Sequence, residues 1–185
     1  MRLFIAVPLP DEVAKAALSL QERLRRALPS GVKWTDPSQF HLTLHFLGET
    51  GEDRLALLRE IISGASRQLS FKIALKGAGA FPSPEKPQIL WAGLEDAAGG
   101  LSALHALLGG ALAARGFVLE KRTFSPHITL GRIKTDQLRL PSGLLAHEAS
   151  VSSSSGEVWE VELVESQLLS SGPEYSILAR ARLGG

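Results

Sequence analysis

Helix-like and strand-like segments alternate along the chain in both of its halves. Apolar positions recur every three or four residues, the spacing of amphipathic helices, at 12–28, 53–69 and 101–115. Compact or alternating apolar runs predict strands at 3–7, 32–35, 40–47, 71–75, 89–93, 127–133, 158–169 and 175–183. The last two strands predict a hairpin that turns at Ser170–Pro173. Because both kinds of element recur in each half, the pattern predicts a duplicated α+β fold.

Glycine and proline mark a break between the two halves. Gly77–Pro87 is rich in both and is predicted to be a linker, or a loop where two lobes meet. We therefore interpret residues 1–185 as one domain made of two pseudo-symmetric lobes, roughly 1–76 and 77–185, between which terminal strands could be exchanged. The serines of Ser152–Ser155 indicate a turn or flexible loop.

Composition excludes several kinds of chemistry. The chain has no cysteine, which excludes disulfides, thiolate nucleophiles and cysteine zinc sites. Its net charge of +1 means that any contact with nucleic acid must come from local clusters of charge. No apolar run reaches the roughly 18 residues of a membrane-spanning helix, and the N-terminal segment lacks a cleavage pattern. We therefore expect a cytoplasmic protein without membrane contact.

One short motif occurs twice, once in each half. His41–Leu44 and His127–Leu130 both read histidine, aliphatic residue, threonine, leucine. In a strand, alternate side chains share a face, so the histidine and threonine of each motif point together while the aliphatic residues enter a core. Packing alone does not require this polar pair on the outward face twice. Two such strands facing each other could hold a phosphate-sized anion between them, with the hydroxyls of Thr43 and Thr129 bonded to its oxygens.

Two other readings of the histidines are weaker. His41 and His45 share a strand face but lie about 13 Å apart, too far to bind one metal ion. A metal site at His41 and His127 would need a third ligand, and neither motif strand carries a carboxylate on that face. A serine nucleophile is also disfavoured, because there is no Gly-x-Ser-x-Gly elbow and neither motif places an acid where it would orient a histidine. We expect no metal.

Residues near the motifs are open to two interpretations. By strict alternation Arg132 would face the core, so it could reach the cleft only if Gly131 introduces a bulge or the strand ends there. His45 is predicted to lie on the cleft face, where it either contacts the ligand or is simply solvated. His105 and His147 are interpreted as incidental.

The paired motifs resemble those of the 2H phosphoesterase superfamily and, within it, the RNA 2',3'-cyclic phosphodiesterases, also called 2'-5' RNA ligases. The likeness extends over most of the chain: Arg2–Ala6, His41–Gly48, Phe81–Pro84, Leu90–Gly93, Phe124–Arg132, Glu165–Ser166, Tyr175 and Leu178. Two features depart from the family pattern. His45 stands where Lys or Arg is frequent, and the Ser152–Ser155 patch has no counterpart.

The resemblance implies a bilobal α+β fold in which two antiparallel sheets line a central cleft, with helices packed outside and no metal or organic cofactor. It implies hydrolysis of 2',3'-cyclic phosphates at RNA 3' ends or on nucleotides, leaving a 2'-phosphate. In that pattern His41 is the proton donor and His127 the proton acceptor, while Arg132 clamps the phosphate. We expect a monomer. A non-catalytic module that binds nucleotides or RNA ends is the alternative, and reversible 2'-5' ligation could use the same site.

Overall fold

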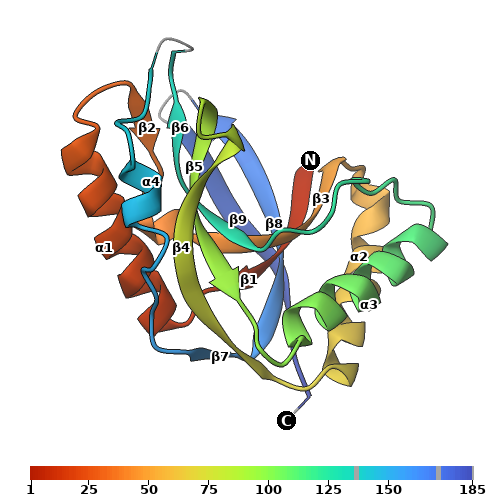
Figure 1. Cartoon of the computed structure of the whole chain (residues 1–185). Helices are drawn as coiled ribbons and strands as arrows, with labels where there is room; N and C mark the ends of the chain where they lie inside the picture. The colour runs from red at the N-terminus through yellow and green to blue at the C-terminus, as the bar shows by residue number, and fades with distance from the viewer. Residues whose placement is uncertain (136–137, 170–171, 185) are drawn as a thin grey trace.

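The structure, a computed structural model, describes residues 1–135, 138–169 and 172–184. Within these ranges strands and helices are mixed (Figure 1). The strands are β1 Arg2–Pro8, β2 Val32–Trp34, β3 His41–Glu49, β4 Phe71–Ser83, β5 Lys86–Glu95, β6 His127–Ile133, β7 Gly156–Val158, β8 Glu160–Leu169 and β9 Gly172–Arg182. The α-helices are α1 Asp11–Ala27, α2 Leu55–Ser63, α3 Gly100–Ala114 and the short α4 Leu144–His147. The predicted α+β class is confirmed.

The strands form one curled antiparallel sheet, in the order β7-β4-β5-β6-β3-β1-β8-β9, and β2 pairs with β6 beside this path (Figure 1). The two motif strands, β3 and β6, are neighbours at the centre of the order. Their pairing consists of a single antiparallel residue pair, Leu42 with Ile128. The two predicted sheets are therefore continuous through this one pair.

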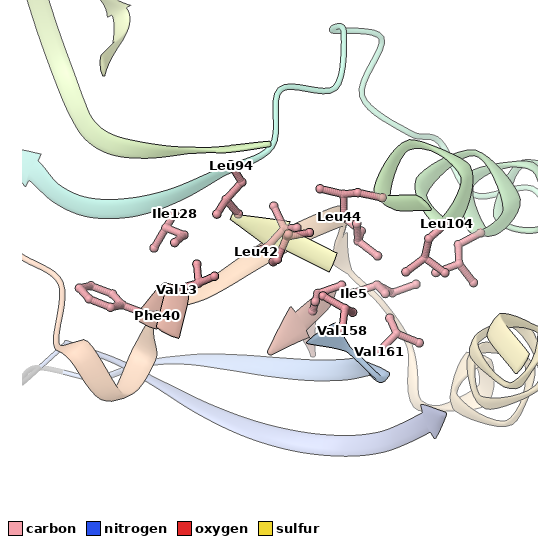
Figure 2. Packing of buried hydrophobic residues seen from close by; sticks show 14 of the residues in the cluster. Ile5, Val13, Phe40, Leu42, Leu44, Leu94, Leu104, Ile128, Val158 and Val161 are labelled. Carbon is pink, nitrogen blue, oxygen red and sulfur yellow. The ribbon is translucent and has the colours of Figure 1, made fainter. Parts of the chain in front are cut away.

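The helices cover the sheet on the face that receives the aliphatic residues of the motifs. Helix α1 packs against β4, β6 and β7, whereas α2 packs against β8 and β9 and α3 against β3 and β4 (Figure 1). Figure 2 shows Leu42 and Ile128 in the same apolar cluster as Val13 of α1 and Leu104 of α3. All four side chains are fully buried. The aliphatic positions of both motifs thus face the core, as the alternation predicts.

Elements from the two halves of the sequence are interleaved in the sheet. Strand β2 pairs with β6, and the C-terminal hairpin of β8 and β9 extends the sheet beyond β1. The predicted hairpin is confirmed, although Ser170 and Ser171 of its turn lie outside the described residues. The proposed division into lobes at residue 76 stays a prediction.

The prediction that Gly77–Pro87 is a linker, or a loop where two lobes meet, is wrong, because this segment is the end of β4, a hairpin turn and the start of β5. At least one of its glycines is required by close packing against the paired strand. A Cβ atom on Gly79 would lie 2.1 Å from Cζ2 of Trp91 on the paired strand, a separation that no side chain tolerates. The Ser152–Ser155 patch is also held to β4, because Leu75 donates its N–H to Ser153 Oγ at 2.8 Å.

Both motif strands carry a β-bulge directly after the threonine. In β3, Thr43 pairs with Ala6 and His45 with Ile5, so Leu44 is the extra residue. In β6, Trp91 pairs with Thr129 and Leu90 with Gly131, so Leu130 is the extra residue. A bulge shifts the alternation of side chains by one position. Residues beyond each bulge therefore lie on the face opposite to the one that alternation predicts.

A buried glutamine of α1 supports the bulge in β6. Gln21 is only 2% exposed, and its Nε2 donates to the backbone oxygens of Leu130 at 2.8 Å and Thr35 at 2.7 Å. The N–H of Thr35 also donates to the Leu130 oxygen, at 2.9 Å. The carbonyl of Leu130 thus accepts hydrogen bonds from groups outside the β5–β6 pairing, which stabilises the bulged conformation.

Replacing Gln21 by Leu should destabilise the protein by about 1–3 kcal/mol, because buried carbonyls lose their side-chain donor. Urea denaturation monitored by circular dichroism measures this loss. Gln88→Leu is the matched control, since Gln88 is exposed and should tolerate the same change. Equal unfolding free energies for the two variants would contradict the role assigned to Gln21.

Candidate active site

The histidines and threonines of the two motifs lie on the sheet face opposite to the helices, and we call this the motif face. Side chains at His41, Thr43, His127 and Thr129 are all half-buried, whereas their aliphatic neighbours are fully buried. Extending the antiparallel Leu42–Ile128 register by one residue either way sets His41 opposite Thr129 and Thr43 opposite His127. His41 and His127 are then diagonal neighbours across the two strands. Residues in that relation lie roughly 7–8 Å apart, which leaves room for a phosphate group between the two imidazoles.

The two imidazoles are oriented in the same way by the main chain. Nδ1 of His41 lies 2.7 Å from the backbone oxygen of Gln39, and Nδ1 of His127 lies 2.7 Å from that of Ser125. A carbonyl only accepts, so each Nδ1 carries the proton and donates it. Each neutral ring therefore leaves Nε2 unprotonated and free to exchange a proton with a ligand.

His41 is packed between two aromatic rings from distant parts of the chain. Phe4 of β1 stacks on it, with centroids 4.9 Å apart, and Tyr175 of β9 meets it edge to face at 5.3 Å. Its orienting residue is tied to the same hairpin, because Nε2 of Gln39 donates to the backbone oxygen of Pro173 at 2.6 Å. The position of His41 thus depends on β9.

His127 has different neighbours. Phe81 of β4 meets its ring edge to face at 5.0 Å, and Trp91 of β5 lies 6.3 Å away. The segment before His127 is held by β5, where the N–H of Leu94 donates to the backbone oxygen of Pro126 at 3.1 Å. The motifs are alike, yet the rings around His41 come from β1 and β9 and those around His127 come from β4 and β5.

Burial lowers the pKa of both histidines. For His41 the desolvating surroundings dominate, the bond to the Gln39 carbonyl opposes them, and the charge of His127 lowers the pKa further. For His127 burial again dominates, the Ser125 carbonyl opposes it, and the guanidinium of Arg132 lowers the pKa further. Both rings are therefore driven toward the neutral form before an anion binds.

Arg132 lies on the motif face, which settles its predicted ambiguity in favour of the bulge. Because Leu130 is the extra residue, Gly131 takes the core-facing position and Arg132 returns to the side of Thr129. Its charge acts on the pKa of Tyr175 as well as that of His127. A cation therefore lies on the motif face close to His127 and Tyr175.

The prediction that His45 lies on the cleft face is wrong. The bulge at Leu44 turns His45 into the core, where it is 6% exposed and its Nε2 lies 2.9 Å from the backbone oxygen of His105. Phe46 takes the place on the motif face instead. It is 52% exposed, and its ring lies 6.0 Å from that of Phe4. Phe46 thus occupies the position in β3 that Arg132 occupies in β6.

Several residues that shape the site were missed from the sequence. Gln39 and Ser125 act through backbone carbonyls, which leave no side-chain signal. The aromatic neighbours come from strands distant in sequence: Phe4, Phe81 and Tyr175. Two signals were available: each carbonyl lies two residues before its histidine, and the segments that resemble the family include Phe4, Phe81 and Tyr175. In the described ranges no cluster of three metal-binding side chains is found, and none of the helices there is long and apolar enough to cross a membrane.

Comparison with known proteins identifies the family. Residues 7–91 match the model of the LigT-like phosphoesterases. An RNA 2',3'-cyclic phosphodiesterase of Archaeoglobus fulgidus is 35% identical over 96% of this chain and 98% of its own length. The chain belongs to the LigT-like phosphoesterase family. A second relative of that name, from Thermus thermophilus, is 36% identical over all of this chain and 91% of its own length.

Solved structures of the family share the fold. A crystal structure of a Thermus thermophilus protein superposes with a TM-score of 0.82 at 33% identity, covering 100% of this chain and 99% of the other. E. coli LigT in complex with 3'-AMP gives a TM-score of 0.78 at 28% identity, covering 98% and 97%. The curled sheet described above is thus the architecture of the family.

Acidification should destabilise the free protein through its histidines. The pKa values of His41, His45, His105 and His127 are all lowered on folding, so between the folded values and about 6.5 the unfolded chain binds more protons. Their contribution is present above about pH 6.5 and is lost as pH falls through the lowered values. Melting temperatures at about pH 7.5 and 5.5 measure the effect.

Replacing the exposed His147 by Ala should leave this slope unchanged, and it serves as the control. A melting temperature that is constant or rises on acidification would contradict the assignment.

Proposed function

We propose that this protein hydrolyses 2',3'-cyclic phosphodiester ends of RNA to 2'-phosphate ends by acid and base catalysis between His41 and His127. The observation that carries the proposal is the matched pair of imidazoles on one face, each with Nδ1 bonded to a carbonyl and Nε2 left for chemistry. Relatives named RNA 2',3'-cyclic phosphodiesterase and the LigT complex with 3'-AMP support this substrate class.

The reaction needs one neutral and one protonated imidazole. Nε2 of His127 accepts a proton from water as the water oxygen bonds to phosphorus. The bond from phosphorus to O3' breaks, and Nε2 of His41 gives its proton to O3'. The products are a 2'-phosphate and a 3'-hydroxyl, and solvent restores the two protonation states.

The unequal surroundings of the histidines support this order. Burial is the largest cause that lowers the pKa of both histidines, and the guanidinium of Arg132 lowers that of His127 further. The cation beside His127 thus favours the neutral ring that a base requires, and an anionic phosphate beside His41 stabilises its imidazolium. Activity should therefore depend on pH as a bell, falling in acid when His127 is protonated and in alkali when His41 loses its proton.

The remaining residues of the motif face bind the substrate. Thr43 and Thr129, opposite the two histidines, donate hydrogen bonds to non-bridging oxygens as charge builds up on phosphorus. Arg132 pairs with the same phosphate. The exposed ring of Phe46 offers a surface on which a base can stack. We infer that the protein acts in this way as a cytoplasmic monomer without a metal or organic cofactor.

Replacing either His41 or His127 by Ala should abolish nearly all turnover of a 2',3'-cyclic nucleotide, because each proton transfer contributes about 10²–10⁴-fold. The assay contains EDTA, which should not reduce the wild-type rate, and it distinguishes 2'- from 3'-phosphate products. His147→Ala, which removes an exposed imidazole, is the matched control. Unchanged hydrolysis by either motif variant would refute the assignment. Tight nucleotide binding without turnover by the wild type would instead indicate the non-catalytic binding module.

Arg132→Ala should raise KM for the cyclic phosphate on the order of tenfold, since a bond between a charged donor and the phosphate is lost. It should also move the acidic limb of the pH profile toward higher pH, because the pKa of His127 is no longer lowered by the guanidinium. Arg26→Ala, an exposed arginine on α1, is the control. An unaltered KM and acidic limb would place Arg132 outside the site.

A further inference from the structure

Three aromatic rings form a continuous stack on the core side of the first motif strand. The imidazole of His45 on β3 stacks on that of His105 on α3, with centroids 4.2 Å apart and planes 22° apart. The ring of Phe124 stacks on the other side of the His105 ring, with the centroids of Phe124 and His105 4.0 Å apart and their planes 14° apart. The stack therefore joins the first motif strand, a helix and the segment that leads into the second motif strand.

The main chain of α3 is adapted to this stack. His45 donates from Nε2 to the backbone oxygen of His105, which fixes its ring against the helix. Gly109, one turn further along α3, leaves room for the ring, because a Cβ there would lie 3.0 Å from Cε1 of His45. Glycine inside a helix costs stability relative to alanine, so this position is consistent with a requirement for the contact.

The stack ends next to the carbonyl that orients His127. Phe124 is followed directly by Ser125, whose backbone oxygen accepts the bond from His127 Nδ1. Between the end of α3 at Ala114 and the start of β6 at His127 the chain forms no helix or strand. Its tertiary anchors there include the Phe124 ring on His105 and the bond from Leu94 to Pro126. The stack thus holds the chain at the residue directly before Ser125.

We propose that His105, together with His45, is a positioning residue for His127: the stack holds the Phe124–Pro126 segment so that the Ser125 carbonyl keeps the proton of His127 on Nδ1 and Nε2 toward the substrate. The kinetic consequence rests on the proposed function, whereas the orientation of the ring does not. His41 is independent of the stack, since its carbonyl is anchored through Gln39 to Pro173.

The stack is a contact between neutral rings. Burial and the nearby imidazole lower the pKa of His105, and burial lowers that of His45. The charged side chains next to Phe124 in the sequence are exposed. Arg122 pairs with Glu120 at 3.4 Å, and Lys121 is exposed as well. On the α2 side, Arg54 lies over Phe117 at 4.2 Å. At neutral pH the stack is therefore intact.

The first test is direct and needs no substrate. Long-range proton–nitrogen correlation spectra of the imidazoles at about pH 7.5, above the reference histidine pKa, distinguish the Nδ1–H from the Nε2–H form. In the wild type both His41 and His127 should carry the proton on Nδ1. His105→Leu keeps a side chain of similar volume but removes the flat ring. It should shift His127 to a mixture of both forms and leave His41 unchanged.

The matched variants separate the stack from general damage. His105→Phe restores a flat ring and should restore the His127 signal, and Phe124→Leu should disturb it from the other end. His147→Ala should change neither histidine. If His105→Leu fails to fold, Phe124→Leu carries the test. An unchanged His127 tautomer in a folded His105→Leu or Phe124→Leu variant would overturn the proposal, and so would a failure of folded His105→Phe to restore it.

Kinetics provide the second readout. His105→Leu should lower kcat for a 2',3'-cyclic nucleotide on the order of tenfold, because a small misplacement of a catalytic group is costly, while KM stays nearly constant. His105→Phe should recover most of kcat. A raised KM with unchanged kcat would overturn the positioning role. Absence of turnover in the wild type, with the tautomer shift observed, would instead remove the proposed function and leave the positioning intact.

Discussion

The site depends on one antiparallel contact at the centre of the sheet, the pairing of Leu42 with Ile128. Both side chains are fully buried in the core formed with α1 and α3, so the apolar cluster that stabilises the fold also fixes the distance between the two motif strands. The histidines and threonines beside this pair have no freedom to separate without opening the core. Hydrophobic burial on one face thus preorganises polar chemistry on the other.

Strand alternation predicted this arrangement as far as the threonines, and only the family resemblance indicated Arg132 beyond them. Alternation correctly assigned His41, Thr43, His127 and Thr129 to one face because their motifs are regular strand. It failed beyond them, since a bulge depends on which residues of a neighbouring strand pair, and no local pattern encodes that. His45 and Arg132 therefore lie on opposite faces from those that regular alternation gives them.

The same limitation explains the error at Gly77–Pro87. Glycine and proline were read as signs of a linker, but Gly79 is small because Trp91 lies against its backbone. Only the pairing of β4 with β5 reveals that contact. The aromatic rings around the two histidines were hidden for a similar reason, because Phe4, Phe81 and Tyr175 are brought to them by the topology of the sheet.

The tether between Gln39 and Pro173 has a consequence for the order in which the protein matures. The two residues are 134 positions apart, so the first histidine motif leaves the ribosome long before the strand that secures it. During synthesis His41 has neither the Gln39 anchor nor the edge of Tyr175. The surroundings of His41 are therefore complete only after β9 has been translated and has joined the sheet.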